Sequence, residues 1–268
     1  MEDLLAIARE AEIADGAAPL DEAAVLTLRH RPGSVRSWLD PDGFAVLIGS
    51  EVSVVVRPSA RGRGIGSRLL GQLLGETSGP LVGWSHGGSA AADALATGHG
   101  FRAARELWVM RRPTTETLPP LPAPPEGIVV RGFRPGDEEQ LLRVNALAFA
   151  HHPEQGSLTL AWLRERMAEP WFEAAGLIEA WSGSTLLGFH WTKRHSPTLG
   201  EVYVVGISPE AQGRGLGRLL TLAGLHHLAD VDEVHLYVEA DNTPAVRLYS
   251  GLGFTHAAAD THVQFARD

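Results

Sequence analysis

Two glycine-rich loops carry the clearest chemistry in this 268-residue sequence. The first reads Arg61-Gly62-Arg63-Gly64-Ile65-Gly66, and the second reads Gln212-Gly213-Arg214-Gly215-Leu216-Gly217-Arg218. Each follows an apolar run that ends in proline, at Pro58 and at Pro209, and each opens a helical stretch. Unpaired N–H groups and the helix dipole favour an anion at such a helix start, and the arginines add positive charge. The sequence therefore predicts one phosphate-binding element in each half of the chain.

Plain strand–turn–helix junctions and nucleotide-binding loops are the alternatives for these two segments. The triphosphate-binding pattern requires Lys-Ser or Lys-Thr after the last glycine, and neither loop has it. The dinucleotide-binding pattern places an acidic residue about 20 positions further on, at the end of the next strand. Here the segment 237–254 instead predicts a strand, a turn with Asn242, a short amphipathic helix and an exit at Gly253-Phe254.

This order of a glycine loop, an Asn-bearing turn and a Gly-Phe exit resembles the GCN5-related N-acetyltransferase (GNAT) superfamily. The resemblance implies that the loop amides hold the pyrophosphate of acetyl-CoA, with acetyl-CoA as co-substrate and room for one molecule in each half. The implied acetyl-CoA contacts, besides the two loops through Arg218, are Val54, Val55, Val56, Val205, Gly206, Ile207, Asn242 and Arg247.

Acetyl transfer from a thioester to an amine requires a neutral amine, a donor for the oxyanion and a proton for the departing thiolate. Glu201, at the head of the strand before the second loop, is the candidate base, directly or through water. Tyr249, on the predicted short helix, is the candidate acid. Considered alone, Glu201 could be a solvated strand-edge charge and Tyr249 a packed aromatic; the surrounding motif favours the catalytic interpretation.

The two halves can be aligned through their loops, because Pro209 and Pro58 differ by 151 positions. Glu201 then falls opposite Ser50. Aligned through Gly253-Phe254 and Gly100-Phe101, Asn242 falls opposite Ser89 and Tyr249 opposite Ala96. The first half thus keeps the phosphate loop but lacks the carboxylate, amide and phenol, so we expect it to bind acetyl-CoA without catalysing transfer.

Segments 143–156, 187–193 and 200–204 resemble the mycothiol synthase family, tandem acetyltransferases of actinobacteria. That resemblance implies acetylation of the cysteinyl amine of 1D-myo-inositol 2-(L-cysteinylamino)-2-deoxy-glucopyranoside. The implied acceptor contacts are Glu22, Glu154, Lys193, Glu201 and Tyr237. Two other functions stay open: acetylation of another amine, such as a protein N-terminus or an aminoglycoside, and a non-catalytic acyl-CoA sensor.

The same patterns predict an α/β protein of two tandem GNAT-type domains, each a central mixed β-sheet flanked by helices. We place the first domain at residues 1–112 and the second at 128–268. A proline-rich linker at 113–127 joins them, because prolines crowd this stretch and disfavour helix. Helical patterns at 3–14 and 137–149 open the two domains.

The composition of the chain limits which binding partners we expect. The net charge is −9 with no long Lys/Arg run, which argues against nucleic acid and anionic membranes. An acidic start and the lack of a long apolar run predict a cytoplasmic protein, which we expect to be a monomer acting on small molecules. The chain has no cysteine to ligate a metal. Its two histidine pairs, His151-His152 and His226-His227, consist of sequence neighbours, whose side chains point in different directions on a helix or strand. We therefore expect no metal site.

Overall fold

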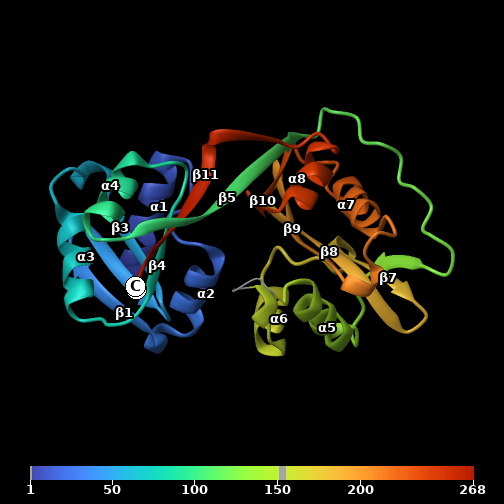
Figure 1. Cartoon of the computed structure of the whole chain (residues 1–268), viewed down its shortest axis with the longest axis horizontal. Helices are drawn as coiled ribbons and strands as arrows, with labels where there is room; N and C mark the ends of the chain where they lie inside the picture. The colour runs from blue at the N-terminus through green and yellow to red at the C-terminus, as the bar shows by residue number, and fades with distance from the viewer. Residues whose placement is uncertain (1, 151–154) are drawn as a thin grey trace. The chain divides into compact units, whose positions relative to one another are not determined.

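The computed structural model describes residues 2–150 and 155–268. These form two compact units that share the same plan of helices around a sheet (Figure 1). The first unit contains residues 1–109, 239–242 and 256–268, and the second contains residues 110–238 and 243–255. The α/β class predicted from the alternating patterns is confirmed.

The first unit arranges its strands in the order β1-β2-β3-β4-β11, where β11 is the C-terminal strand Thr255–Arg267. Neighbouring strands are antiparallel except for the parallel pair β3 and β4, so the sheet is mixed. Its elements are α1 (Glu2–Asp15), α2 (Glu22–His30), η1 (Pro32–Ser34), β1 (Val35–Asp40), β2 (Gly43–Ile48), β3 (Glu51–Val56), η2 (Pro58–Ala60), α3 (Ile65–Gly75), β4 (Leu81–Ser85), α4 (Ala90–Gly98) and the first part of β5 (Arg102–Pro113).

The second unit arranges its strands in the order β10-β9-β8-β7-β6, again antiparallel except for one parallel pair, β9 and β10. Its elements are β6 (Val129–Gly132), α5 (Glu138–Ala148), η3 (Gln155–Ser157), α6 (Leu160–Met167), η4 (Ala174–Gly176), β7 (Leu177–Ser182), β8 (Thr185–Ser196), β9 (Leu199–Ile207), η5 (Pro209–Ala211), α7 (Leu216–His227), β10 (Glu233–Glu239) and α8 (Thr243–Ser250).

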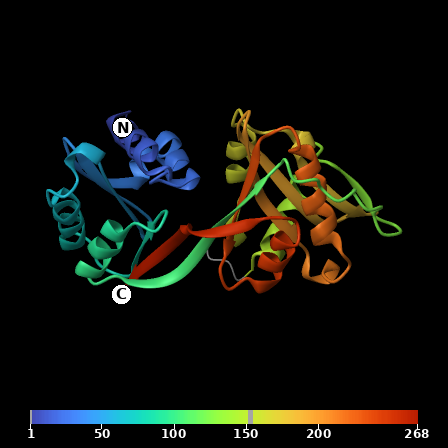
Figure 2. The ribbon, with the colours of Figure 1, turned by 90° about the horizontal axis from the view of Figure 1, so that it is seen from above.

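Helices cover both faces of each sheet (Figure 2), and the strand sequences show why. Phe44 and Val46 of β2 pack with α1 and α2, whereas Ala45 and Leu47 pack with α3. Successive side chains of a strand point to opposite faces, so a strand covered on both faces must be apolar throughout. In the second unit Leu177 likewise belongs to the core beneath α5 and α6, and Ile178 to the core beneath α7.

The C-terminal strand contributes residues to both units. β11 (Thr255–Arg267) begins in the second unit, but its residues from His256 onward belong to the first, where Val263–Arg267 pair with Ser85–Leu81 of β4. Phe265 is buried in the core beneath α3. Sequential patterning suggested that each half folds on its own residues, because strand pairing between segments some 180 positions apart leaves no local trace.

The proline-rich connector starts slightly later than predicted. β5 continues through Pro113, and no helix or strand lies between it and Val129. The helices expected at 3–14 and 137–149 are present as α1 and α5. Among the described residues, no helix is both long and apolar enough to cross a membrane.

Candidate active site

The two glycine loops have the same backbone conformation. In each, a short 3-10 turn starts at the proline, and two glycines adopt positive φ: 75° and 79° at Gly62 and Gly64, 74° and 77° at Gly213 and Gly215. Gly64 and Gly215 are the residues immediately before α3 and α7. Only glycine adopts this conformation without strain, so both sequences specify a loop whose last amides open a helix.

A pocket of about 560 Å³ lies beside the first loop. Of the nine residues predicted to contact acetyl-CoA in this half, all except Arg63 line it: Val54, Val55, Val56, Arg61, Gly62, Gly64, Ile65 and Gly66. Arg61 also forms a bidentate ion pair with Asp15, at 2.6 and 2.7 Å. The pocket has the size range of small-ligand and cofactor sites.

Two of the three positions aligned with the catalytic candidates occupy equivalent places in the first unit. Ser89 caps α4 by accepting the Ala92 N–H at 3.3 Å, just as Asn242 immediately precedes α8. Ala96 lies on α4, as Tyr249 lies on α8. Ser50 immediately precedes β3, whereas Glu201 lies within β9, so the phenol and the carboxylate are both absent from the aligned positions.

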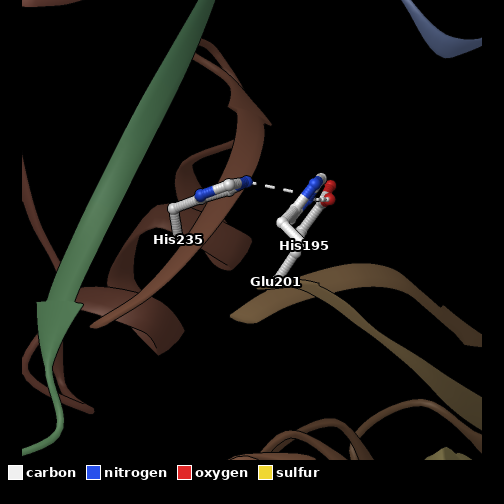
Figure 3. Close-up of side chains that lie close together, drawn as sticks. All are labelled: His195, Glu201 and His235. Atoms are coloured by element: carbon white, nitrogen blue, oxygen red, sulfur yellow. Dashed lines mark hydrogen bonds and ion pairs between the residues drawn. The ribbon is translucent and has the colours of Figure 1, made fainter. Parts of the chain in front are cut away.

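Glu201 lies on β9 between two flanking strands of the second unit. Lys193 of β8 is its antiparallel partner and His235 of β10 is its parallel partner. His195 Nε2 donates a hydrogen bond to Glu201 Oε2 at 2.6 Å. His235 Nε2 lies 3.7 Å from the same oxygen (Figure 3). Three adjacent strands thus surround one buried carboxylate, which is 5% exposed.

A β-bulge brings His195 to this place. Arg194 pairs with Gly200 and Ser196 with Leu199, so His195 is the extra residue on β8. A second bulge lies at Tyr203 of β9, because Thr192 pairs with Val202 and Trp191 with Val204. Bulges re-aim side chains near functional sites, which is the effect here on His195.

The surroundings of Glu201 fix its charge. Burial alone would raise the pKa of Glu201, but the hydrogen bond from His195 and the nearby His235 outweigh burial and lower the pKa to about 2. The carboxylate is therefore ionised at neutral pH and can only accept hydrogen bonds. Because the carboxylate only accepts, His195 Nε2 is the donor in their 2.6 Å hydrogen bond. Within the described residues, Nδ1 makes no hydrogen bond.

Lys193 and Tyr237, two more predicted acceptor contacts, lie on the strands that flank β9: Lys193 pairs with Glu201 in the register of β8, and Tyr237 follows His235 on β10. The Lys193 ammonium lies 4.8 Å from the centre of the Trp171 ring and 5.1 Å from that of Tyr203, a cation–π arrangement. Tyr237 packs edge-on against His235, two residues before it on β10, and is 45% exposed. Polar groups of three strands therefore gather around Glu201.

Tyr249 lies on α8, with its ring 5.9 Å from that of Phe254. Burial raises the pKa of Tyr249 to about 12, so the phenol keeps its proton at neutral pH. The remaining predicted cofactor residues of this half are at the end of β9 (Val205, Gly206, Ile207), in the second loop, directly before α8 (Asn242) and on α8 (Arg247). Gly206 faces Phe189, whose ring a Cβ would meet at 2.7 Å.

The two other predicted acceptor contacts are Glu22 and Glu154. Glu22 is the first residue of α2, in the first unit. Glu154 lies outside the described residues, as do His151 and His152. The two histidines of the other pair have different partners: His226 contacts the Pro119 carbonyl, and His227 contacts Glu173.

His195 and His235 were not singled out from the sequence. His235 alternates with Tyr237 on a strand, a signal that could have placed it beside Glu201 once the strand pairing was known. No such signal exists for His195, because its orientation depends on a bulge.

Comparison with known proteins identifies the family of the chain. Residues 144–254 match the acetyltransferase (GNAT) family. The chain is 59% identical to a mycothiol acetyltransferase of a Nocardioides species, over 99% of this chain and 98% of that protein. It is 50% identical to a mycothiol acetyltransferase of Thermomonospora curvata, over 97% and 92% of the two chains.

Solved structures show the same fold. A GCN5-related N-acetyltransferase from Sphaerobacter thermophilus superposes with a TM-score of 0.67 at 26% identity, over 98% of this chain and 91% of that one. A tandem GNAT protein from the clavulanic acid biosynthesis pathway superposes with a TM-score of 0.70 at 18% identity, covering 99% and 94%. The chain therefore belongs to the mycothiol acetyltransferase family of acetyl-CoA-dependent, tandem-GNAT N-acetyltransferases.

Proposed function

We propose that the chain transfers the acetyl group of acetyl-CoA to the cysteinyl amine of 1D-myo-inositol 2-(L-cysteinylamino)-2-deoxy-glucopyranoside, the last step of mycothiol biosynthesis. The observation that carries the proposal is the buried Glu201 carboxylate, with His195 and His235 beside it and Lys193 as its register partner on β8. This group suits an acceptor that offers a cationic amine and many hydroxyls, and the family's name specifies the same product.

The Glu201–His195 pair prepares the amine. Glu201 attracts the ammonium form, and because its own pKa is about 2, the carboxylate alone is a weak proton acceptor. The pair acts as one unit: the proton leaves the amine, directly or through water, and is held on the imidazole beside the carboxylate. The neutral nitrogen then attacks the thioester carbon.

Backbone groups stabilise the oxyanion, and Tyr249 protonates the departing thiolate. The oxyanion accepts hydrogen bonds from the backbone around Val205, Gly206 and Ile207. As the C–S bond breaks, the phenol of Tyr249 gives its proton to the CoA thiolate. A phenol of raised pKa holds its proton until the sulfur develops charge, so this step is concerted with departure.

Each unit binds acetyl-CoA in this proposal, the second for reaction and the first without turnover. The support in the first unit is its pocket and its loop, which repeats the φ angles of the second. The enzyme would work in the cytoplasm as a monomer on small molecules alone. Sedimentation of the purified chain with and without acetyl-CoA tests the monomeric state.

The decisive experiment combines acetyl-CoA with the cysteinyl sugar and follows the product by mass. A gain of one acetyl group that withstands hydroxylamine identifies an amide, whereas a labile product is a thioester on the acceptor's own sulfur. Turnover of an aminoglycoside or a peptide N-terminus at the same rate would overturn the assigned acceptor. Binding of acetyl-CoA with no product from any amine would instead identify a sensor.

A further inference from the structure

His195, Glu201 and His235 together present the ligand set of a transition-metal site. One ligating atom from each residue lies within 4.8 Å of the others. The three side chains come from the adjacent strands β8, β9 and β10, and both imidazoles point toward the carboxylate (Figure 3). Ligands on neighbouring strands of one sheet are held more firmly than ligands on loops.

The donor types select the class of metal. Two imidazole nitrogens and one carboxylate oxygen suit Zn²⁺ and its neighbours, whereas Mg²⁺ and Ca²⁺ prefer all-oxygen ligands. Ligands at zinc distances of about 2.0–2.2 Å stand roughly 3.3 Å apart around a tetrahedral ion. The observed Glu201 separations of 2.6 Å to His195 and 3.7 Å to His235 bracket that value, and all three ligand atoms lie within 4.8 Å of one another, so side-chain movements that draw the two imidazoles together complete the geometry.

A second observation points independently to a ligand. His235 is 6% exposed, and its Nε2 has no hydrogen-bond partner among the described residues, although that atom faces Glu201. A buried nitrogen left unpaired is costly unless something occupies it at some stage. The His195 side chain is 34% exposed, which gives an ion a route from solvent and leaves a coordination position open.

We propose that His195, Glu201 and His235 bind a Zn²⁺-class divalent metal ion, and that occupancy of this site inhibits acetyl transfer. A metal bonded to Glu201 and His195 removes both the carboxylate that attracts the ammonium and the imidazole that takes its proton. Inhibition is then competitive with the amine acceptor. Metal binding stands on geometry alone, whereas the inhibition rests on the proposed function.

The pair His227 and Glu173 provides a matched control. Their contact, at 3.0 Å, resembles that of His195 and Glu201, but no third ligand joins it among the described residues and Glu173 is 51% exposed. A His227→Gln variant therefore removes a histidine–glutamate contact of the same unit without touching the proposed site.

The first test measures metal binding without substrates. Protein stripped with chelator is titrated with Zn²⁺ by calorimetry and with Co²⁺ by visible absorption, whose intensity rises on tetrahedral coordination. One ion per chain is expected for the parent and for His227→Gln, with affinity at least tenfold weaker in His195→Gln and His235→Gln. His195 is partly exposed, so its variant tests the site even if His235→Gln unfolds on heating at a lower temperature. No stoichiometric binding, or equal affinity in His195→Gln and the parent, would overturn the proposal.

The second test measures inhibition. A seryl analogue of the acceptor replaces the cysteinyl sugar, so that the acceptor's thiol does not chelate the added zinc, and product is followed by mass in a zinc buffer. Zn²⁺ should raise the apparent KM for the amine and leave the KM for acetyl-CoA nearly fixed, with full recovery on chelation. Binding without any loss of rate would refute the inhibition, and absence of turnover before zinc is added would count against the proposed function instead.

Discussion

Glu201 and Tyr249 are buried side chains whose surroundings shift their acidities in opposite directions. Histidines hold the carboxylate ionised, and apolar packing keeps the phenol protonated. Such pairs of titratable groups are the usual mark of assigned acid and base roles. Sequence motifs could place both residues, since each lies at a fixed distance from a glycine loop or Gly-Phe exit, but only the pairing of β8 with β9 reveals His195.

Replacing Glu201 with Gln should lower kcat by about 10²–10⁴, the usual loss when one positioned proton-transfer group is removed. Glutamine keeps the shape but neither attracts the ammonium nor orients His195. Steady-state kinetics on Glu201→Gln, with Glu173→Gln as the matched control, checks this. A rate close to that of the parent would show that the carboxylate is structural.

Lys193→Ala should raise the KM for the sugar acceptor about tenfold, because an unmatched hydrogen-bonding partner costs about 1–3 kcal/mol and 1.4 kcal/mol is a factor of ten. The KM for acetyl-CoA should stay nearly constant. Arg194→Ala is the control, since the neighbouring Arg194 pairs with Asp230 instead. A change confined to the KM for acetyl-CoA would remove Lys193 from the acceptor site.

At the scale of elements, the two glycine loops have the same backbone conformation, but we expect mutations in them to affect turnover differently. Gly64→Glu and Gly215→Glu impose the same strain, because both positions have φ near 80°. Turnover should survive largely intact in Gly64→Glu and be lost in Gly215→Glu, where the carboxylate blocks the pyrophosphate. Equal losses in kinetic assays of the two variants would contradict catalysis by the second unit alone.

The contact between β8 and α7 gives the fold a pH dependence. His190 is fully buried, donates Nδ1–H to the Leu220 carbonyl at 2.8 Å and lies against Gly224, where any Cβ would clash with the ring at 2.0 Å. Burial lowers the pKa of His190 from 6.5 to about 4. Between these values the unfolded chain binds the extra proton, so the stability present above pH 6.5 falls as pH decreases toward 4.

His190 should contribute a fall of up to about 1.4 kcal/mol per pH unit to the unfolding free energy over this range. Glu179, whose pKa is raised by burial to about 7, contributes with the opposite sign, so denaturant unfolding is compared between the parent and variants. His190→Phe keeps a ring but does not titrate, so its stability should depend less steeply on pH, with a constant offset from the lost hydrogen bond. His30→Asn, at an exposed histidine, should retain the slope of the parent. Parallel slopes for all three proteins would mean that His190 titrates alike in the folded and unfolded states.

At the scale of the whole molecule, the sequence predicted two repeats but not the exchange of the last strand. Loops, opening helices and the proline-rich connector are local features, and their residues specify them locally. The pairing of β11 with β4 is decided by which edge the final strand can reach, and residues of similar β-propensity would serve either unit.

Deleting residues 256–268 should destabilise the first unit, because β4 loses a neighbour and the core beneath α3 loses Phe265. Hydrogen exchange of β4 amides should accelerate strongly, while those of β7 and β8 in the second unit stay protected. Phe265→Ala is the milder variant, with an expected cost of about 3–5 kcal/mol. Unchanged protection of β4 in both variants would show that the first unit is complete without β11.

The placement of β11 also bears on how the protein is made. A ribosome delivers the first unit before the second, and domains usually fold in that order. Here the first sheet is completed after the second unit, because its β4 edge pairs with β11 residues that follow residue 255, the last residue of the second unit. Throughout translation of the second unit that edge stays open to pairing with another nascent chain. Premature termination within the second unit therefore leaves the first unit without its closing strand.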